Sequence, residues 1–235
     1  MPNAENPANL SPLISYLFPA GVVAADLREP GDPALLLPAE AKYLGRAIPK
    51  RTREFAAGRL CARRALAEFG IVDVAVEVAD DRQPIWPDSM VGSITHTAGF
   101  CAAVVAERRV VAALGLDSEV VGDVNAEIWP RVGVPAETAW LRTLPASQHP
   151  AAMTLIFSAK EAFYKCQYPL ARERLDFQDV RVEAGWGTSQ GHFWVHATRH
   201  LAVAQRTAMP MQGRYLFHRE FVTAGLGLAA ADYVQ

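Results

Sequence analysis

Cysteine is scarce in this sequence. Only Cys61, Cys101 and Cys166 occur, and no two of them form a Cys-x-x-Cys motif. An odd number of widely spaced cysteines argues against a disulfide framework and is typical of reduced thiols in the cytosol. We therefore expect a cytoplasmic protein.

An excess of charge of either sign is also lacking. The chain has 23 lysines and arginines against 25 aspartates and glutamates, which gives a net charge of −2. A balance this close to neutral argues against general binding to nucleic acids or membrane surfaces, although it leaves room for a local basic pocket.

Long apolar runs are absent too. The most apolar region, residues 100–116, is interrupted by Glu107, Arg108 and Arg109, so no segment suits a membrane-spanning helix. The first residues lack the basic start and the apolar run of a signal peptide. These absences predict a soluble protein that has neither a membrane nor a nucleic acid among its partners.

The chain has enough apolar residues for a substantial core. They make up 51% of its 235 residues, which suffices for one large domain or two small ones. From Pro38 the apolar spacing becomes helical and predicts a helix over 52–69, with Gly70 as its stop. Two weaker helical patterns lie within 120–150.

Strand-like runs occur in both halves of the chain. We expect strands over 13–18, 22–25, 72–78, 91–96, 100–106, 109–112, 114–116, 180–183, 191–197, 214–217 and 221–226. The runs between 91 and 116 are expected to be consecutive strands of one antiparallel sheet. Together with the helices, these strands predict an α+β fold.

The two halves of the chain also carry similar stretches. Residues 55–63 and 157–165 each start with phenylalanine, have alanine two positions later, and carry charged residues four and eight positions after the phenylalanine. We interpret this as an internal duplication, with an N-terminal half over 1–115 and a C-terminal half over 116–235. Two similar, pseudo-symmetric halves in one monomer would place a ligand site in the cleft between them.

The stretch 157–165 has the pattern of a helix start. Ser158 suits an N-cap and Glu161 follows three residues later, which is a capping-box pattern, and Pro169 is expected to end the helix. Glu161 and Lys165 are four residues apart and so share one helix face. In isolation this is only a cap and a surface ion pair, worth roughly a few tenths of a kcal/mol.

Three carboxylates change that interpretation, because they offer oxygen ligands for a metal. Asp117 is predicted at a strand end, Glu119 lies two residues on and on the same side, and Glu161 opens the predicted helix. Mg²⁺ prefers oxygen ligands and usually takes one or two carboxylates with substrate phosphate oxygens and water. Cations suited to phosphate are also present: Arg51, Arg59, Arg63, Arg82, Lys160 and Lys165. A metal with several fixed cations suits a pyrophosphate.

Four ordered stretches of the sequence resemble 4′-phosphopantetheinyl transferases. Residues 115–119 (Gly-Leu-Asp-Ser-Glu) and 157–165 (Phe-Ser-Ala-Lys-Glu-Ala-Phe-Tyr-Lys) are similar to the two signature motifs of that family. Residues 50–66 and 82–96, the latter ending in Gly-Ser-Ile-Thr-His, resemble the branch that activates enterobactin and surfactin synthetases. Ser118 stands where the family often has an apolar residue, so its hydroxyl is a candidate for a water contact at the site.

The resemblance implies a role for each residue of the two signature motifs. Asp117, Glu119 and Glu161 would bind Mg²⁺, with Mn²⁺ as the alternative metal, together with the pyrophosphate of coenzyme A. Glu161 and Lys165 are the implied catalytic residues: Glu161 would deprotonate the incoming serine, and Lys165 would reach the phosphate under attack.

The resemblance also implies coenzyme A contacts. Arg51, Arg59 and His96 would hold the adenosine and phosphate end. The full set of implied coenzyme A contacts is Arg51, Arg59, Arg63, Arg82, Thr95, His96, Lys160 and Lys165.

The activity implied is transfer of the 4′-phosphopantetheine arm from coenzyme A to a serine of an apo-acyl or peptidyl carrier protein, with release of 3′,5′-ADP, by a monomer. Two other classes stay open. One is another Mg²⁺-dependent phosphoryl or pyrophosphate-cleaving enzyme, which the same carboxylates could serve. The other is a non-catalytic module that binds coenzyme A or a carrier protein. The carrier itself, from a fatty-acid, polyketide or peptide synthase, stays open as well.

Overall fold

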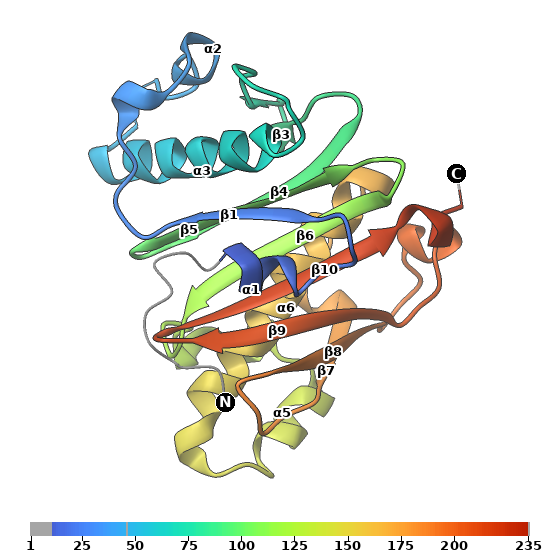
Figure 1. Cartoon of the computed structure of the whole chain (residues 1–235). Coiled ribbons are helices and arrows are strands. Elements are labelled where there is room, and N and C mark those ends of the chain that lie inside the picture. Colours follow the sequence, from blue (N-terminus) through green and yellow to red (C-terminus); the bar gives the residue numbers. More distant parts are fainter. Residues whose placement is uncertain (1–10, 46, 235) are drawn as a thin grey trace.

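Two antiparallel sheets form the body of the molecule (Figure 1). The computed structural model describes residues 11–45 and 47–234. The smaller sheet has the strand order β1-β5-β4, the larger has the order β6-β10-β9-β8-β7, and β2 and β3 form a separate hairpin. The strands are β1 (Val23–Leu27), β2 (Glu77–Val78), β3 (Pro84–Ile85), β4 (Met90–Thr97), β5 (Phe100–Glu107), β6 (Val111–Val120), β7 (Val180–Ala184), β8 (Gln190–Ala197), β9 (Met211–His218) and β10 (Phe221–Ala229).

Each sheet carries one long helix (Figure 1). α3 (Pro49–Ala67) packs against β1 and β5, and α6 (His149–Ala171) packs against β6 and β10. The shorter helical segments are α1 (Ser11–Ser15), α2 (Pro38–Ala41), α4 (Trp129–Val132), α5 (Pro135–Leu141) and the 3-10 turns η1 (Pro33–Leu35), η2 (Ala126–Ile128), η3 (Ala146–Gln148), η4 (Phe177–Asp179), η5 (Ala202–Gln205) and η6 (Ala230–Asp232). The predicted α+β class is confirmed. No helix within the described ranges is long and apolar enough to cross a bilayer.

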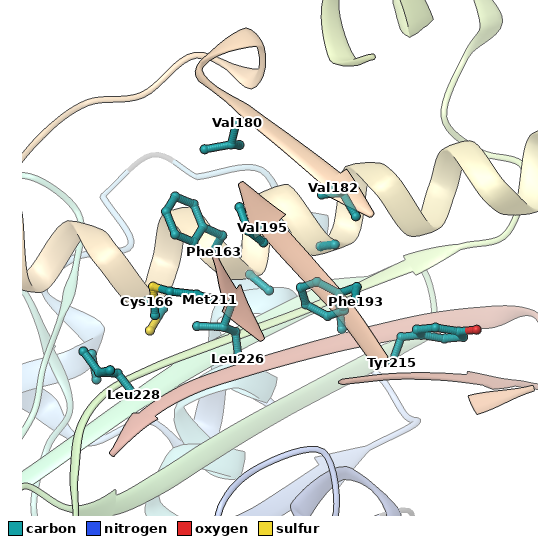
Figure 2. Close-up of a cluster of buried hydrophobic side chains, with 14 of the residues drawn as sticks. Phe163, Cys166, Val180, Val182, Phe193, Val195, Met211, Tyr215, Leu226 and Leu228 are labelled. Carbon is teal, nitrogen blue, oxygen red and sulfur yellow. The ribbon is translucent and has the colours of Figure 1, made fainter. Parts of the chain in front are cut away.

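A separate apolar core lies under each long helix. The core under α6 contains Phe163, Cys166 and Phe193, which are fully buried (Figure 2). The core under α3 is built from smaller side chains such as Cys61 and Ala103. Burial of each large side chain is worth about 1.5–3 kcal/mol. These cores therefore fix the two helices from which most of the site residues project.

Helix α3 agrees with the helix predicted over 52–69, but it begins three residues earlier. Pro49 occupies the first turn, where its missing N–H has no helical partner to lose. The helix ends at Ala67, and Gly70 follows in the left-handed region at φ 73°, which glycine adopts without a Cβ clash.

The predicted start and end of the second long helix were wrong. α6 begins at His149, so Ser158 lies in its middle rather than at its N-cap, and its buried hydroxyl donates to the Asp117 carbonyl oxygen at 3.1 Å. Pro169 lies inside the last turn, and the helix ends at Ala171. Burial of twelve of its side chains against neighbouring elements outweighs the local signals of Ser158 and Pro169.

The prediction of one continuous antiparallel sheet over 91–116 was also wrong. The runs 109–112 and 114–116 belong to a single strand, β6, which pairs with β10 in the larger sheet. β4 and β6 still lie side by side, but side-chain hydroxyls join them instead of a backbone ladder. Ser93 Oγ accepts from the Leu116 amide at 3.0 Å, and Thr95 Oγ1 accepts from the Ser118 amide at 2.9 Å. Two hydroxyl groups thereby bridge the seam between the sheets, beside an apolar cluster that includes Val91 of β4 and Leu116 of β6.

Two further strand predictions fail because short apolar runs do not distinguish strand from helix or loop. Part of the run 13–18 lies in α1, and most of 72–78 is loop, with only Glu77–Val78 paired. The predicted boundary between residues 115 and 116 falls inside β6. The division into two domains and the pseudo-symmetry of the halves stay predictions.

Candidate active site

A cavity of about 1010 Å³ lies between α3 with its sheet on one side and β6 with the end of α6 on the other. The hairpin of β2 and β3 forms a further wall. Eight of the predicted site residues line this cavity: Arg51, Arg59, Arg82, Thr95, His96, Asp117, Glu119 and Lys165. Segments far apart in the sequence therefore bring cations and carboxylates to one space.

The carboxylates of Asp117 and Glu119 project from the same face of β6. Asp117 is only 4% exposed, and its Oδ1 accepts from Lys165 Nζ at 2.7 Å. Lys165 also donates to the Leu116 carbonyl oxygen at 3.1 Å. Burial, and then the charge of Asp117, raises the pKa of Glu119 to about 8. Burial and Asp117 also raise the pKa of Glu161 above its usual range.

These groups fit a hard divalent cation. Asp117 Oδ2 is buried and has no hydrogen-bond partner in the part of the chain that the structure describes, which leaves one carboxylate oxygen available for a ligand. A cation would also offset the repulsion that raises the pKa values of Glu119 and Glu161. As the side chains stand, no three histidine, cysteine, aspartate or glutamate side chains in residues 11–45 and 47–234 converge closely enough to hold a metal. The ligand set of Asp117, Glu119 and Glu161 stays a prediction.

The opposite wall of the cavity is basic. Arg51 Nη1 contacts His96 Nε2, and burial followed by the Arg51 charge lowers the pKa of His96. Arg59 is 7% exposed and lies over the Phe55 ring, 4.2 Å from its centroid. Its Nη2 makes a long hydrogen bond of 3.5 Å to the Glu77 carbonyl oxygen, and its Nε has no partner among the residues that the structure describes. Burial lowers the pKa of Arg59 to about 10, so the fold holds a desolvated cation next to the cavity.

Comparisons with known proteins decide the family. A model of the 4′-phosphopantetheinyl transferase N-terminal domain matches residues 39–106, and a model of the 4′-phosphopantetheinyl transferase superfamily matches residues 113–209. The 4′-phosphopantetheinyl transferase Svp of Streptomyces mobaraensis is 35% identical over 224 residues, which cover 93% of this chain and 90% of that protein.

The chain belongs to the 4′-phosphopantetheinyl transferase family.

Two other relatives agree with this assignment. The transferase Npt of Nocardia iowensis is 36% identical over 170 residues, 72% of this chain and 76% of that protein. Enterobactin synthase component D of Escherichia coli K12 is 35% identical over 129 residues, 54% of this chain and 58% of that protein. The resemblance seen in the four sequence stretches is confirmed.

Two cations of this phosphopantetheinyl transferase, Arg63 and Lys160, do not line the large cavity. This differs from the coenzyme A contacts that were predicted for them. Arg63 forms an ion pair with the fully buried Glu40 and donates to the Leu35 carbonyl oxygen at 2.6 Å. Glu40 in turn accepts from the Val76 amide at 3.0 Å. Arg63 therefore ties α3 to the loops beside it, and a carboxylate already neutralises its charge.

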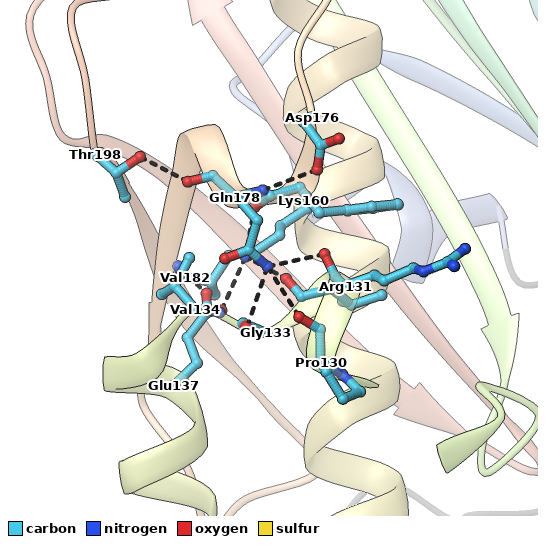
Figure 3. Close-up of polar contacts among 12 residues, drawn as sticks. Pro130, Arg131, Gly133, Val134, Glu137, Lys160, Asp176, Gln178, Val182 and Thr198 are labelled. Carbon is cyan, nitrogen blue, oxygen red and sulfur yellow. Dashed lines mark hydrogen bonds and ion pairs between the residues drawn. The ribbon is translucent and has the colours of Figure 1, made fainter. Parts of the chain in front are cut away.

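Lys160 is the second of these cations (Figure 3). It is 2% exposed, and its ammonium group donates to Val132 O at 2.7 Å, to Phe177 O at 2.8 Å and to Glu137 Oε2 at 2.8 Å. An ammonium group has three hydrogens, so no donor is left for a phosphate. The family resemblance implied a coenzyme A contact for Lys160, but its side chain points from α6 toward Glu137 of α5 instead.

Glu161 lies beside a second, smaller cavity of about 280 Å³. Tyr164, one turn further along α6, borders both cavities. The predicted base therefore lines the smaller cavity, while Asp117 and Lys165, whose charges affect its pKa, line the large one. We predicted no role for Tyr164, although its position next to Lys165 in the second motif was a usable signal.

Ser118 faces away from the carboxylates, because neighbouring residues on a strand point to opposite faces. Its Oγ lies 2.5 Å from Thr223 Oγ1, which lies 2.8 Å from His218 Nε2. The water contact considered for Ser118 beside the metal is thus replaced by a buried network behind β6. Burial lowers the pKa of His218, which is 8% exposed, to about 4.

His218 should make the stability of this transferase fall with acidity. Its pKa in the unfolded chain is about 6.5, so between pH 6.5 and 4 the unfolded state binds a proton that the folded state does not. The stabilisation by neutral, buried His218 is present above the unfolded-state pKa of about 6.5 and is lost as the pH falls through the folded-state pKa of about 4. We expect this group to contribute on the order of 1–3 kcal/mol to the loss in unfolding free energy between pH 7 and 4.

Urea denaturation at several pH values measures this effect. His218→Gln should flatten the dependence of unfolding free energy on pH, whereas the control His192→Gln, at an exposed position on β8, should keep it. An identical acid dependence in His218→Gln and in the wild type would contradict the role of His218.

Proposed function

We propose that this chain transfers the 4′-phosphopantetheine arm of coenzyme A to a serine of an apo-carrier protein, giving holo-carrier and 3′,5′-ADP. The observation that carries the proposal is the cavity itself, whose lining includes arginines together with the buried Asp117 and the half-buried Glu119, and among the described residues Asp117 Oδ2 has no hydrogen-bond partner. This is the charge distribution that a pyrophosphate between a nucleotide and an arm requires.

Glu161 is the proposed general base. A serine hydroxyl is a weak nucleophile at neutral pH, so a positioned acceptor for its proton is required. As the serine Oγ forms its bond to the β-phosphorus of coenzyme A, its proton passes to the Glu161 carboxylate. Burial raises the pKa of Glu161, which brings this base closer to the working pH. The bond from the β-phosphorus to the bridging oxygen breaks, and 3′,5′-ADP leaves with its electron pair.

Lys165 and the carboxylates act at the pyrophosphate. Lys165 pairs with the Asp117 carboxylate and lines the cavity, so its ammonium group can donate to an oxygen of the phosphate under attack. Asp117, Glu119 and Glu161 would hold Mg²⁺. When bound, the metal would neutralise charge on the pyrophosphate oxygens and on the departing nucleotide phosphate.

The basic wall binds the nucleotide end. Within residues 11–45 and 47–234 no carboxylate pairs with the desolvated guanidinium of Arg59, so an anionic ligand is the partner that would complete it. Arg51 and His96 lie beside it, and Arg82 faces the same cavity from the hairpin tip. These four residues would bind the phosphates of the 3′,5′-ADP moiety.

Incubation with coenzyme A, Mg²⁺ and purified apo-carriers tests the proposal. The carriers should come from fatty-acid, polyketide and peptide synthases, since nothing in the cavity selects among them. We expect the mass of at least one carrier to rise by one phosphopantetheine arm, with 3′,5′-ADP released in equal amount. Pyrophosphate cleavage without any carrier would instead indicate a hydrolase, and binding without turnover would indicate a non-catalytic module.

Arg59→Met should weaken coenzyme A binding far more than it slows turnover. Methionine keeps the apolar stem over Phe55 and removes the guanidinium, so a contact made in the ground state is lost and KM should rise by ~10–100-fold with kcat little changed. Steady-state kinetics on an apo-carrier measures both constants. The matched control is Arg64→Met, because Arg64 lies on the same helix but is exposed and does not line the cavity.

A second measurement addresses the 3′-phosphate. The Arg51→Ala/Arg59→Met double variant should discriminate less between coenzyme A and 3′-dephospho-coenzyme A than the wild type does. An unchanged preference for the 3′-phosphate would indicate that Arg82 and His96 recognise this phosphate instead.

A further inference from the structure

The hairpin of β2 and β3 is anchored at its base but has little support of its own at its tip. Each strand has only two residues, and a hairpin this short is not stable alone. At the base, Glu77 Oε2 accepts from Tyr43 Oη at 2.9 Å and lies 2.5 Å from Lys42 Nζ. The tip, residues 79–83, carries Arg82 and forms one wall of the large cavity.

Arg82 is held in an unfavourable backbone conformation. Its φ of 72° lies in the left-handed region, which residues other than glycine seldom occupy. The turn around it is closed by the Arg82 amide to Ala79 O and the Ala79 amide to Gln83 O, both at 2.8 Å. A conformation of this kind persists only where the surroundings restrain it.

The Asp81 carboxylate supplies that restraint. Its Oδ1 accepts from the Gln83 amide at 3.2 Å, and its Oδ2 accepts from Gln83 Nε2 at 2.7 Å. The same Oδ2 accepts from Arg172 Nη1 at 2.7 Å, across the cavity from the hairpin. Both neighbours of Arg82 in the sequence are therefore tied through one carboxylate to the end of α6.

Both the backbone and the side chain of Arg172 have contacts with α6 that hold the residue in place for this ion pair. It caps α6 at φ 54°, with its amide bonded to Tyr168 O at 2.9 Å. Its guanidinium lies 5.9 Å from the centroid of the Tyr168 ring, and Tyr168 stacks on Tyr164 at 5.4 Å. The three side chains form a row along α6, and all three line the cavity.

We propose that Arg172 and Asp81 are positioning residues that hold Arg82 over the cavity for the phosphates of coenzyme A. The inference rests on the proposed function. The ion pair is too exposed to serve stability, because 63% of the Arg172 side chain is in solvent and exposed pairs contribute little. Its effect is geometric: it joins the tip of the hairpin to α6, the helix that carries Glu161 and Lys165.

Arg172→Asn tests this inference without straining the fold. Asparagine tolerates the left-handed conformation at a helix end, so the melting temperature should stay the same or rise. The dissociation constant for coenzyme A with Mg²⁺, measured by titration calorimetry on the full chain, should rise by about fivefold or more. The control Arg174→Asn removes the same charge two residues further on, outside the cavity lining, and should leave the constant unchanged.

A double-mutant cycle with Arg82→Ala separates positioning from direct binding. If Arg172 acts through Arg82, then Arg172→Asn should have no further effect in the Arg82→Ala background. Asp81→Asn, which keeps an oxygen for the Gln83 amide, should weaken binding as Arg172→Asn does, and the two together should be no worse than either alone.

Three results would overturn the inference. Unchanged affinity in Arg172→Asn would show that the pair has no role in binding. Additive losses from Arg172→Asn and Arg82→Ala would show that Arg172 contacts the coenzyme itself. Absence of coenzyme A binding by the wild-type chain would overturn the proposed function as well, which distinguishes that failure from the other two.

Discussion

Glu161→Gln is expected to lower turnover by ~10²–10⁴-fold, which corresponds to roughly 3–5 kcal/mol in the activation barrier, while the protein stays folded. Glutamine has the same shape as glutamate and is an equally good helix former, so α6 should be unaffected. What is lost is a proton acceptor for the serine and a negative ligand for the metal. In the metal-free protein the melting temperature should stay the same or rise, because burial and Asp117 already disfavour the charged form of Glu161.

The matched control is Glu137→Gln, which should lower the stability of the protein and leave its turnover unchanged. Glu137 is 2% exposed and pairs with Lys160, so Glu137→Gln leaves a buried ammonium without its counter-charge. Breaking a buried ion pair in this way costs about 3–5 kcal/mol of stability. The folded fraction should nevertheless retain its kcat. Turnover at saturating coenzyme A and Mg²⁺, beside melting curves, measures both. Wild-type loading of carriers by Glu161→Gln would remove Glu161 from the mechanism.

Asp117→Asn is expected to abolish transfer, to ~1% of the wild-type rate or below, with little change in fold. Asp117 contributes two features that asparagine lacks together: a negative Oδ1 that holds Lys165, and an Oδ2 that has no hydrogen-bond partner among the described residues. An amide in this place would weaken the hold on Lys165 and reduce the charge available to a metal. We therefore expect Asp117→Asn to lose metal binding itself, and not only the transfer step that follows it.

Thermal stabilisation supplies a readout that does not depend on activity. A ligand that binds the folded state raises the melting temperature by mass action. Coenzyme A with Mg²⁺ should raise it in the wild type and much less in Asp117→Asn. The control Asp123→Asn removes an exposed carboxylate close enough to affect the pKa of Glu119, and it should behave as the wild type does. Near wild-type transfer by Asp117→Asn at ordinary Mg²⁺ would contradict the metal assignment.

Residue types and short-range spacing determined much of this protein. Most of α3 follows from the helical spacing of apolar residues and from Gly70 as its stop, both of which act within a few residues, although the start at Pro49 was not predicted. Asp117 and Glu119 share a face because a strand alternates with a period of two. The α+β class and the transferase family also follow from the sequence, because its motifs and alternating helix and strand patterns are local in the chain.

Long-range pairing decided the rest. A cation next to a motif can face either way, and only packing shows that Lys160 meets Glu137 and that Arg63 meets Glu40. The partner of β6 is more than a hundred residues away along the chain, so its place in the larger sheet cannot be read from its own pattern. The same is true of Asp81 and Arg172, which belong to separate halves of the sequence and meet only across the cavity. Local sequence determines the alternation along a strand and the main signals of α3, whereas tertiary packing decides where α6 begins and ends, which charges are neutralised and which remain for a ligand.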